Sequence, residues 1–210
     1  AKAGHKFKYI PNGLDTSVLV NEPLPEDVIS VIPKNKFVIG YTGTIGLANA
    51  LEYFVDAAGI LKDRTEFYFV IVGEGYLKDE LIAKSKDFGN IVFLNKIRKN
   101  QVQSMIQHFD LCFVGRNDTP LFKHGVSANK YFDYMLAGKP ILDSNNFIKD
   151  PVELSGCGLI VKPDSAQAIA DGILQLHNLS AEERAAMGEK GKVFVSENHN
   201  IRHLASLYID

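Results

Sequence analysis

The sequence predicts an α/β fold, a Rossmann-like parallel sheet with helices on both faces. Short runs rich in β-branched and aromatic residues alternate with stretches of helical periodicity, and glycine or polar residues bound each run. Strands and helices in this order build βαβ units with right-handed crossovers, which cover a parallel sheet from both sides. The 210 residues, of which 46% are hydrophobic, suffice for one such core.

The periodicity indicates six strands and seven helices. The expected strands are residues 37–42, 66–72, 90–94, 110–114, 140–143 and 158–161. The expected helices are residues 48–62, 76–87, 100–108, 128–137, 150–155, 165–178 and 181–196. Two helix starts carry the spacing of a capping box, Asp164 with Gln167 and Ser180 with Glu183.

The first 35 residues differ from the rest. An Asn-Gly pair and four prolines interrupt any regular element there, so residues 1–35 are expected to be an interdomain connector. Residues 36–197 are then the Rossmann-like domain, and residues 198–210 a helical C-terminal tail.

Charge and composition exclude several classes of protein. Lys and Arg number 23 against 25 Asp and Glu, and a net charge of -2 gives no global field for a nucleic acid or an anionic membrane. The longest unbroken apolar run, residues 67–72, is far shorter than the roughly 18 residues of a membrane span. Two cysteines build no disulfide framework, and residues 1–8 contain no signal peptide. A cytoplasmic location is therefore expected.

The loop after the first strand is one candidate binding element. Ligands of open parallel sheets bind beyond the carboxyl ends of the strands. Gly43, Thr44, Ile45 and Gly46 form a small-residue loop there, which lets backbone N–H groups approach a phosphate. A simple tight turn explains the same residues equally well. The loop lacks the third glycine of the dinucleotide fingerprint, so neither NAD nor FAD is expected.

The helix expected at residues 128–137 gives the stronger signal. Ser127 is a candidate N-cap and Gly138 a candidate C′ residue, so the helix N-terminus faces the ligand edge. A helix start favours acidic residues, yet Lys130 lies in the first turn and Lys123 just before it. A bound anion would relieve this arrangement, and a lysine that extends into solvent is the alternative.

Arg116 follows the strand at residues 110–114 and could offer a forked donor to a phosphate or a sugar, with a surface arginine as the alternative. Lys96, Arg98 and Lys99 are interpreted as a solvated charge run. No His, Cys or carboxylate cluster has the spacing of metal ligands. The sequence thus predicts an anion site without a metal.

These stretches resemble a known family. Residues 118–122 and 127–141 are similar to the donor-site helix of retaining glycosyltransferases of the GT-B fold, group 1 (family 4). Residues 10–15, 40–43 and 69–75 resemble the interdomain connector and the first two strands of the same C-terminal domain. Within the family, the closer likeness is to bacterial enzymes that build O-antigen or capsular polysaccharide from nucleotide-activated sugars.

The resemblance implies the nucleotide-sugar-binding half of a two-domain enzyme. The other half would bind the acceptor, either a saccharide or a lipid-linked molecule, and could bring the enzyme to the inner membrane as a peripheral protein. The expected partner of this half is a nucleoside-diphosphate sugar. Neither a cofactor nor a nucleic acid is expected.

The resemblance also implies roles for individual residues. The family usually carries two acidic residues separated by seven. The second corresponds to Asp133, expected to accept hydrogen bonds from ribose hydroxyls, and the first falls at Gly125, which has no carboxylate. Relatives place Arg and Lys around the loop that here contains Thr44. The expected donor-binding residues are Gly43, Thr44, Gly46, Lys123, Gly125, Ser127, Lys130 and Asp133, and the expected catalytic residues are Lys130 and Arg116.

In the expected chemistry, Lys130 and the N–H groups after Ser127 stabilise the departing diphosphate, with Arg116 as a second cation. Two other functions remain open at this stage. One is a nucleotide-sugar 2-epimerase, which has the same two-domain fold and ligand class. The other is a non-catalytic nucleotide-binding scaffold, which the missing acid at Gly125 favours slightly.

Overall fold

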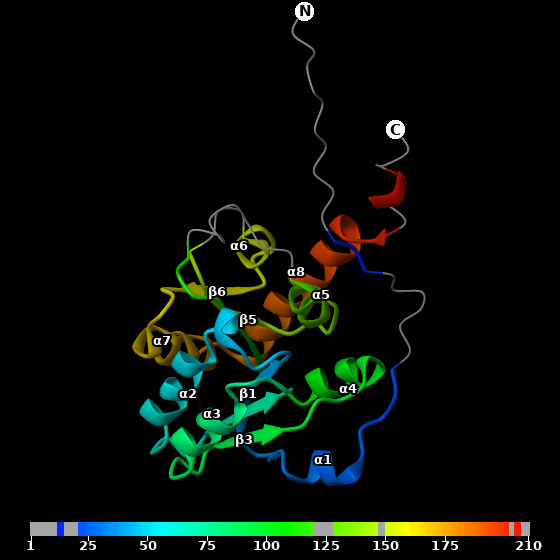
Figure 1. The fold of residues 1–210 in the computed structure, drawn as a ribbon. Coiled ribbons are helices and arrows are strands. Elements are labelled where there is room, and N and C mark those ends of the chain that lie inside the picture. Colours follow the sequence, from blue (N-terminus) through cyan, green and yellow to red (C-terminus); the bar gives the residue numbers. More distant parts are fainter. Residues whose placement is uncertain (1–11, 15–20, 120–127, 147–149, 202–203, 207–210) are drawn as a thin grey trace, which may run out of the picture.

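The computed structural model describes residues 12–14, 21–119, 128–146, 150–201 and 204–206. Within these residues the fold is a six-stranded sheet in the order β3-β2-β1-β4-β5-β6, in which every neighbouring pair is parallel (Figure 1). The strands are β1 (Phe37–Thr42), β2 (Phe67–Val72), β3 (Ile91–Leu94), β4 (Leu111–Gly115), β5 (Ile141–Ser144) and β6 (Gly158–Val161). The predicted Rossmann-like sheet is confirmed.

Helices occupy the connections between the strands. The α-helices are α1 (Glu26–Ser30), α2 (Leu51–Ile60), α3 (Lys78–Ser85), α4 (Val102–Gln107), α5 (Asn129–Leu136), α6 (Pro151–Ser155), α7 (Ala166–His177) and α8 (Ala181–Asn198). Two 3-10 turns, η2 (Leu47–Asn49) and η3 (Lys99–Gln101), precede α2 and α4.

Two expectations about whole elements are wrong. The helix expected at residues 48–62 is divided, because Ala50 adopts a left-handed conformation with φ 47° between η2 and α2. The connector expected to lack regular structure contains α1, which follows Pro25 and carries Glu26 and Asp27 in its first turn. Acidic side chains at that end of a helix interact favourably with its dipole.

The predicted helix caps are partly confirmed. Ser180 and Glu183 form the predicted capping box of α8. At α7, however, the cap is Ser165, whose hydroxyl accepts from the Ala168 N–H, and Asp164 lies outside the helix at φ 53°. The predicted pair Asp164–Gln167 is therefore wrong, because the hydroxyl one residue later satisfies the helix N–H group.

Helix α5 also begins one residue later than its predicted cap implies. Its N-cap is Ala128, which has no side-chain acceptor, so the prediction of Ser127 as the N-cap is wrong. Ser127 itself lies outside the described residues. Gly138 follows the C-cap with φ 67°, as predicted for a C′ glycine.

The sheet has a hydrophobic core on each face. Phe37, Ile39 and Tyr41 of β1 point into one core with α2, α3 and α7, while Val38 points into the other with α4, α5 and α8. Both cysteines, Cys112 and Cys157, are free and buried.

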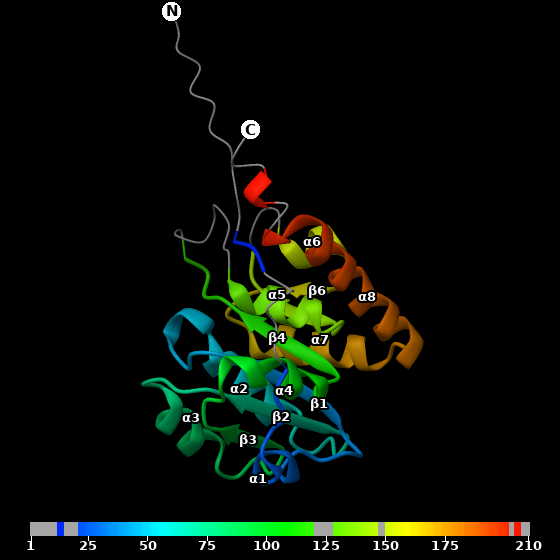
Figure 2. The same ribbon diagram turned by 90° about the vertical axis from the view of Figure 1, so that its right-hand side faces the viewer.

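Two glycines fix the position of α5 against α8. A Cβ atom on Gly188 would lie 1.9 Å from the carbonyl oxygen of Gly138, and one on Gly191 would lie 3.2 Å from Cγ of Met135 in α5. The backbone of α8 can therefore approach the end of α5 only through glycine. Figure 2 shows the two helices packed on the same face of the sheet.

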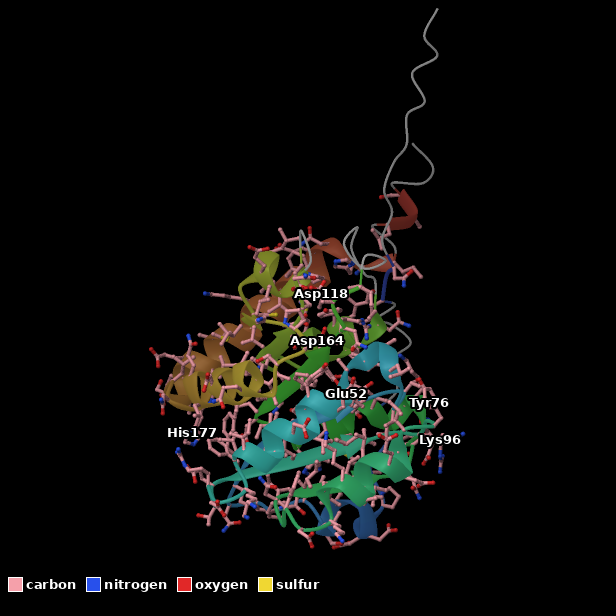
Figure 3. All side chains as sticks on the ribbon, turned by 60° about the vertical axis from the view of Figure 1, so that its left-hand side comes forward. Glu52, Tyr76, Lys96, Asp118, Asp164 and His177 are labelled. Atoms are coloured by element: carbon pink, nitrogen blue, oxygen red, sulfur yellow. The ribbon has the colours of Figure 1, made fainter. Side chains whose placement is uncertain are left out.

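The strand order places a switch point between β1 and β4, because the chain moves outward from β1 in one direction before β4 and in the other from β4 onward. Figure 3 marks the two ends of the sheet, with His177 near the start of β1 and with Tyr76 and Lys96 after β2 and β3. Ligands of such sheets bind at the carboxyl ends beside the switch point. None of the helices in the described ranges is long and apolar enough to cross a membrane.

Candidate functional site

Two cations meet at the switch point and share one neutral acceptor. Arg116 directly follows β4, Lys130 lies in the first turn of α5, and Asn49 ends the 3-10 turn after β1. Lys130 Nζ donates to Asn49 Oδ1 at 2.7 Å, and Arg116 Nη1 donates to the same oxygen. The site therefore draws on three elements that are distant in the sequence.

Lys130 is directed into the protein by Tyr41. Its Nζ donates to the Tyr41 hydroxyl at 2.9 Å and lies 4.3 Å from the centre of that ring, the geometry of a cation–π contact. Tyr41 Oη in turn donates to the Thr44 carbonyl at 2.7 Å. The alternative of a lysine that extends into solvent is therefore wrong.

The surroundings of Lys130 disfavour its charge. Burial lowers its pKa well below the usual value, the adjacent Arg116 guanidinium lowers it further, and the Asp143 carboxylate partly opposes both effects. No carboxylate among the described residues forms an ion pair with Lys130. An anion that reached this lysine would therefore be strongly favoured.

Arg116 anchors the loop after β1 to the end of β4. Its guanidinium is buried and Nη1 also donates to the carbonyls of Ala48 at 3.4 Å and Gly115 at 3.2 Å. A guanidinium carries five N–H donors, so one arginine can hold several partners at once. The surface arginine considered as an alternative is excluded by this burial.

Asp143 lies at the end of β5 and is wholly buried. Neither carboxylate oxygen has a hydrogen-bond partner of good geometry among the described residues. Burial raises its pKa well above the usual value and nearby Asp150 adds to the rise, whereas Tyr131, Asn145 and Arg116 oppose it. The carboxyl group is therefore a weak counter-charge for the two cations.

The glycine loop after β1, residues 43–46, leaves room beside Lys130 but offers few free N–H donors. Gly43 has φ 145°, and a Cβ atom there would lie 3.0 Å from the Tyr41 hydroxyl and 3.5 Å from Lys130 Nζ. Its N–H donates to the Val72 carbonyl at 2.9 Å, so it is already occupied. Thr44 is exposed, and Gly46 lies under the ring of Tyr76.

Asp133 lies on the next turn of α5, mostly buried, and its carboxylate faces Lys99 of η3 with 3.6 Å between Oδ2 and Nζ. Burial raises the pKa of Asp133, and Lys99 opposes this. The interpretation of Lys96, Arg98 and Lys99 as a solvated charge run is thus incomplete, because Lys99 borders the candidate site. Arg98 is exposed and pairs with Glu22 instead.

Several predicted site residues come together and others cannot be placed. Lys130, Arg116, Gly43 and Thr44 lie around Asn49 and Tyr41, and Asp133 lies one turn along α5. Lys123, Gly125 and Ser127 lie outside the described residues.

Sequence reasoning missed Asn49, Tyr41, Lys99 and Asp143. Their positions at or just after the strand ends were visible in the sequence, but a strand-end position by itself does not give the direction of a side chain. In the described part of the chain no group of three or more His, Cys, Asp or Glu residues could hold a metal ion.

No curated protein matches the chain, but solved structures match its fold. Sucrose-phosphate synthase from Thermosynechococcus elongatus superposes with a TM-score of 0.76 at 17% identity, over 95% of this chain and 50% of that one. The C-terminal domain of a group 1 glycosyl transferase, LpcC, from Francisella tularensis gives 0.71 at 22% identity, over 90% and 100%. Anabaena HepE in complex with UDP and glucose gives 0.72 at 16% identity, over 96% and 55%.

The chain thus spans about half the length of sucrose-phosphate synthase and of HepE, and all of the isolated LpcC domain. These identities establish a common fold. The family itself is indicated by a separate comparison, in which the model of the family described as "Glycosyl transferases group 1" matches residues 36–178, more than half of the chain. From this match, on a sheet that carries the same fold, we conclude that the chain belongs to the group 1 glycosyl transferases.

Proposed function

We propose that this chain is the donor-binding domain of its glycosyltransferase, and that Lys130 and Arg116 hold the diphosphate of a nucleoside-diphosphate sugar. The observation that carries the proposal is the shared acceptor: both cations donate to one uncharged oxygen of Asn49. A diphosphate placed between the two side chains would accept charge-assisted hydrogen bonds from both cations.

The start of α5 supports the same ligand. Its N-cap, Ala128, makes no side-chain hydrogen bond to the first turn, and in our proposal the N–H groups at this helix start bind the anion. Lys130, Arg116 and these N–H groups would act together in the transition state, because negative charge develops on the diphosphate as it leaves the sugar. Lys130 and Arg116 are the catalytic residues in this proposal.

The ribose would bind beside Asp133. A carboxylate accepts two hydroxyl hydrogen bonds from a vicinal diol, and Lys99 would exchange its contact with Asp133 for one with the nucleotide. That HepE has been solved with UDP supports a nucleoside diphosphate as the ligand of this fold.

We infer that the acceptor is a saccharide or a lipid-linked molecule bound by a second domain, in the synthesis of a bacterial surface polysaccharide such as O-antigen or capsule, with retention of configuration. The enzyme would be cytoplasmic, and peripheral at the inner membrane through that domain. No metal is required, because the cations at the site already balance the charge of the diphosphate.

A nucleotide panel tests the proposal. Calorimetry with UDP, GDP and ADP, each beside its nucleoside, is expected to show binding that depends on the diphosphate and prefers one base. Lys130→Met keeps most of the side-chain volume and removes the charge, and should weaken diphosphate binding by about 1.5–3 kcal/mol, the range for charge-assisted hydrogen bonds. Unchanged affinity in that variant would exclude the assigned role of Lys130.

The role of Asp133 is tested separately. Asp133→Asn should weaken a ribonucleoside diphosphate more than its 2′,3′-dideoxy analogue, because only the former has hydroxyls to donate. Equal losses for the two ligands would return Asp133 to a structural role.

The alternatives make different predictions for the same panel. A non-catalytic scaffold would show no preference among UDP, GDP and ADP. A 2-epimerase would bind a nucleotide and also exchange hydrogen at the sugar C2 position with solvent, which NMR in D₂O detects.

A further inference from the structure

Lys78, in the first turn of α3, is a buried cation to which the proposed mechanism gives no part. We propose that it is a positioning residue, which holds the loops after β1, β2 and β3 in place around the bound nucleotide. The inference rests on the proposed donor site and adds a residue that lies behind that site.

The ammonium group of Lys78 reaches oxygen atoms from two neighbouring strand ends. Its Nζ donates to the Gly73 carbonyl at 3.1 Å and to Glu74 Oε1 at 2.9 Å, both in the loop after β2. It also donates to Asn95 Oδ1 at 2.9 Å, and the Leu94 carbonyl at the end of β3 lies 3.4 Å away. An ammonium has three N–H donors, so the three shorter contacts use all of them. Lys78 therefore joins the end of β2 to the end of β3.

Without these contacts the place of Lys78 in its helix would be unfavourable. The first turn of a helix favours acidic residues, and Asp79 and Glu80 follow Lys78 in α3. Burial of a lysine also costs free energy unless oxygen atoms replace its water. The Glu74 carboxylate and the other oxygens offset both costs. The cation is therefore stable here only while the two strand ends stay together.

The loop after β2 is in turn bonded to the glycine loop after β1. The Ile45 N–H donates to the Glu74 carbonyl at 2.9 Å. A Cβ atom on Gly73 would lie 1.8 Å from the Gly43 carbonyl oxygen, so the two loops touch through their backbones. A shift of the loop after β2 must therefore move Gly43, which borders Lys130 Nζ.

The segment after β3 leads from Lys78 to the expected ribose site. The N–H of Lys96, labelled in Figure 3, donates to Glu74 Oε1 at 3.4 Å, the same carboxylate that pairs with Lys78. Three residues further on, Lys99 begins η3 and faces the Asp133 carboxylate. Lys78 thus supports both sides of the proposed ligand, the diphosphate and the ribose.

Two lysines of α3 allow a matched test. Lys78→Met keeps most of the side-chain volume and removes the ammonium group, and Lys84→Met makes the same change in the last turn, where Lys84 pairs with Asp56 at 2.6 Å. We expect Lys78→Met to weaken binding of the preferred ligand among UDP, GDP and ADP by about three- to thirtyfold, the range for residues that couple to a site without touching its ligand. Lys84→Met should keep the affinity within about twofold. Lys78→Arg, which retains the charge and the donors, should recover most of the affinity.

Amide hydrogen exchange, measured by NMR on each free variant, separates positioning from a general loss of stability. The amides of Ile45 and Gly73 donate across the two loop junctions, to the carbonyls of Glu74 and Leu94. In Lys78→Met they should exchange at least about tenfold faster relative to the amide of Cys112 in β4. A general loss of stability would leave this ratio unchanged.

The outcomes distinguish the inference from the proposed function. A loss of affinity in Lys78→Met alone, with faster exchange at Ile45 and Gly73, supports the inference. Unchanged affinity in Lys78→Met overturns it while the proposed function stands. Equal losses in the two Met variants, or a loss without faster exchange at the loops, overturn it as well. If the wild-type chain binds none of UDP, GDP and ADP, the proposed function fails and the inference fails with it.

A milder variant decides the case in which Lys78→Met does not fold. Asn95→Ala removes one acceptor of the ammonium group and leaves the lysine in place. It should weaken nucleotide binding by about threefold and speed exchange at Gly73, whose amide bonds to the end of β3. Unchanged affinity and unchanged exchange in Asn95→Ala would overturn the inference.

Discussion

The ammonium group of Lys130 contacts the ring of Tyr41 and the amide of Asn49. We expect its protonation to be coupled to ligand binding. Its pKa is lowered in the free protein, chiefly by burial and then by Arg116. A bound diphosphate would raise that pKa by charge attraction. Between the two pKa values, binding must therefore take up a proton, and affinity must fall as pH rises.

The measurement is calorimetry at about pH 8 and above, where the phosphate groups are already ionised, in buffers of different ionisation enthalpy. We expect proton uptake in the wild-type chain and none in Lys130→Arg, because a guanidinium stays protonated throughout. Proton uptake of the same size in the variant would assign the effect to another group.

We expect Asp143 to make the free energy of unfolding depend on pH. Its pKa is raised in the folded state, so its contribution to the free energy of unfolding is fully present below the ordinary aspartate pKa and is lost as pH rises through the raised value. Asp143→Asn should therefore increase stability at neutral pH by about 1–3 kcal/mol, the range for a buried polar group without a good partner.

Chemical denaturation from acid to neutral pH checks this prediction. The pH profile of Asp143→Asn should be flatter than that of the wild type, with a residual slope from Asp150, whose pKa is also raised. The exposed residue Asp171 provides the control, since Asp171→Asn should leave the profile unchanged. A less stable Asp143→Asn variant at neutral pH would contradict the assignment.

Single residues were the hardest level to predict from the sequence. The lone cation in the first turn of α5 drew attention to Lys130, which in the structure lies beside Tyr41 and Asn49. Its partner Asn49 lies 81 positions away, and only the folded sheet brings the two together. The cap of α7 was misplaced because two neighbouring polar side chains, Asp164 and Ser165, compete for the helix N–H groups, whereas α5 begins after Ala128, which has no polar side chain.

Helices and strands were predicted more fully than single residues, because burial of one face gives each element a hydrophobic period and a characteristic length. All six strands lie within a residue or so of the expected ranges. The break at Ala50 had no signal, since a left-handed residue is usually glycine or asparagine. The contact of α8 with α5 was equally hidden, because the sequence does not tell which glycines allow close approach.

Helix α8 packs against α5, and a substitution at Gly188 tests how much this contact contributes to stability. Replacing a helical glycine with alanine ordinarily stabilises a helix by about 1 kcal/mol. At Gly188 the new methyl group would collide with the Gly138 carbonyl, so Gly188→Ala should instead destabilise the protein by about 1–3 kcal/mol. It should also weaken UDP binding, because α5 carries Lys130 and Asp133.

Thermal and chemical denaturation measure the first effect and calorimetry the second. Ala185→Gly, at an exposed position of the same helix, calibrates the helix propensity and should leave UDP affinity unchanged. If Gly188→Ala were more stable than the wild type, the contact between α8 and α5 would have to be looser than the structure describes.

On the scale of the whole molecule, our proposal assigns the charge at the switch point to two side chains and not to a metal ion. Lys130 comes from α5 and Arg116 from the end of β4, and no cluster of metal ligands occurs in the described ranges. We therefore expect UDP to bind with the same affinity in EDTA as in Mg²⁺. A large loss of affinity in EDTA would reveal a metal-dependent site.

The length of the chain bears on whether it can transfer a sugar by itself. The chain spans about half the length of sucrose-phosphate synthase and of HepE, and the donor site we propose lies at one edge of a single sheet. Transfer requires an acceptor held against the anomeric carbon of the sugar, and positioning of the two reactants supplies a large part of the rate. We expect the 210-residue chain to bind nucleoside-diphosphate sugars without transferring the sugar to saccharide acceptors.

This expectation is checked by mass spectrometry of a reaction with each nucleotide sugar and a panel of mono- and oligosaccharides. Calorimetric binding of the same donors, in the same preparation, shows that the site is intact, and Lys130→Met shows that binding occurs there. Steady multiple turnover by the wild-type chain, lost in Lys130→Met, would mean that this single sheet also holds the acceptor. The need for a second domain would then be wrong, while the donor site at Lys130 would stand.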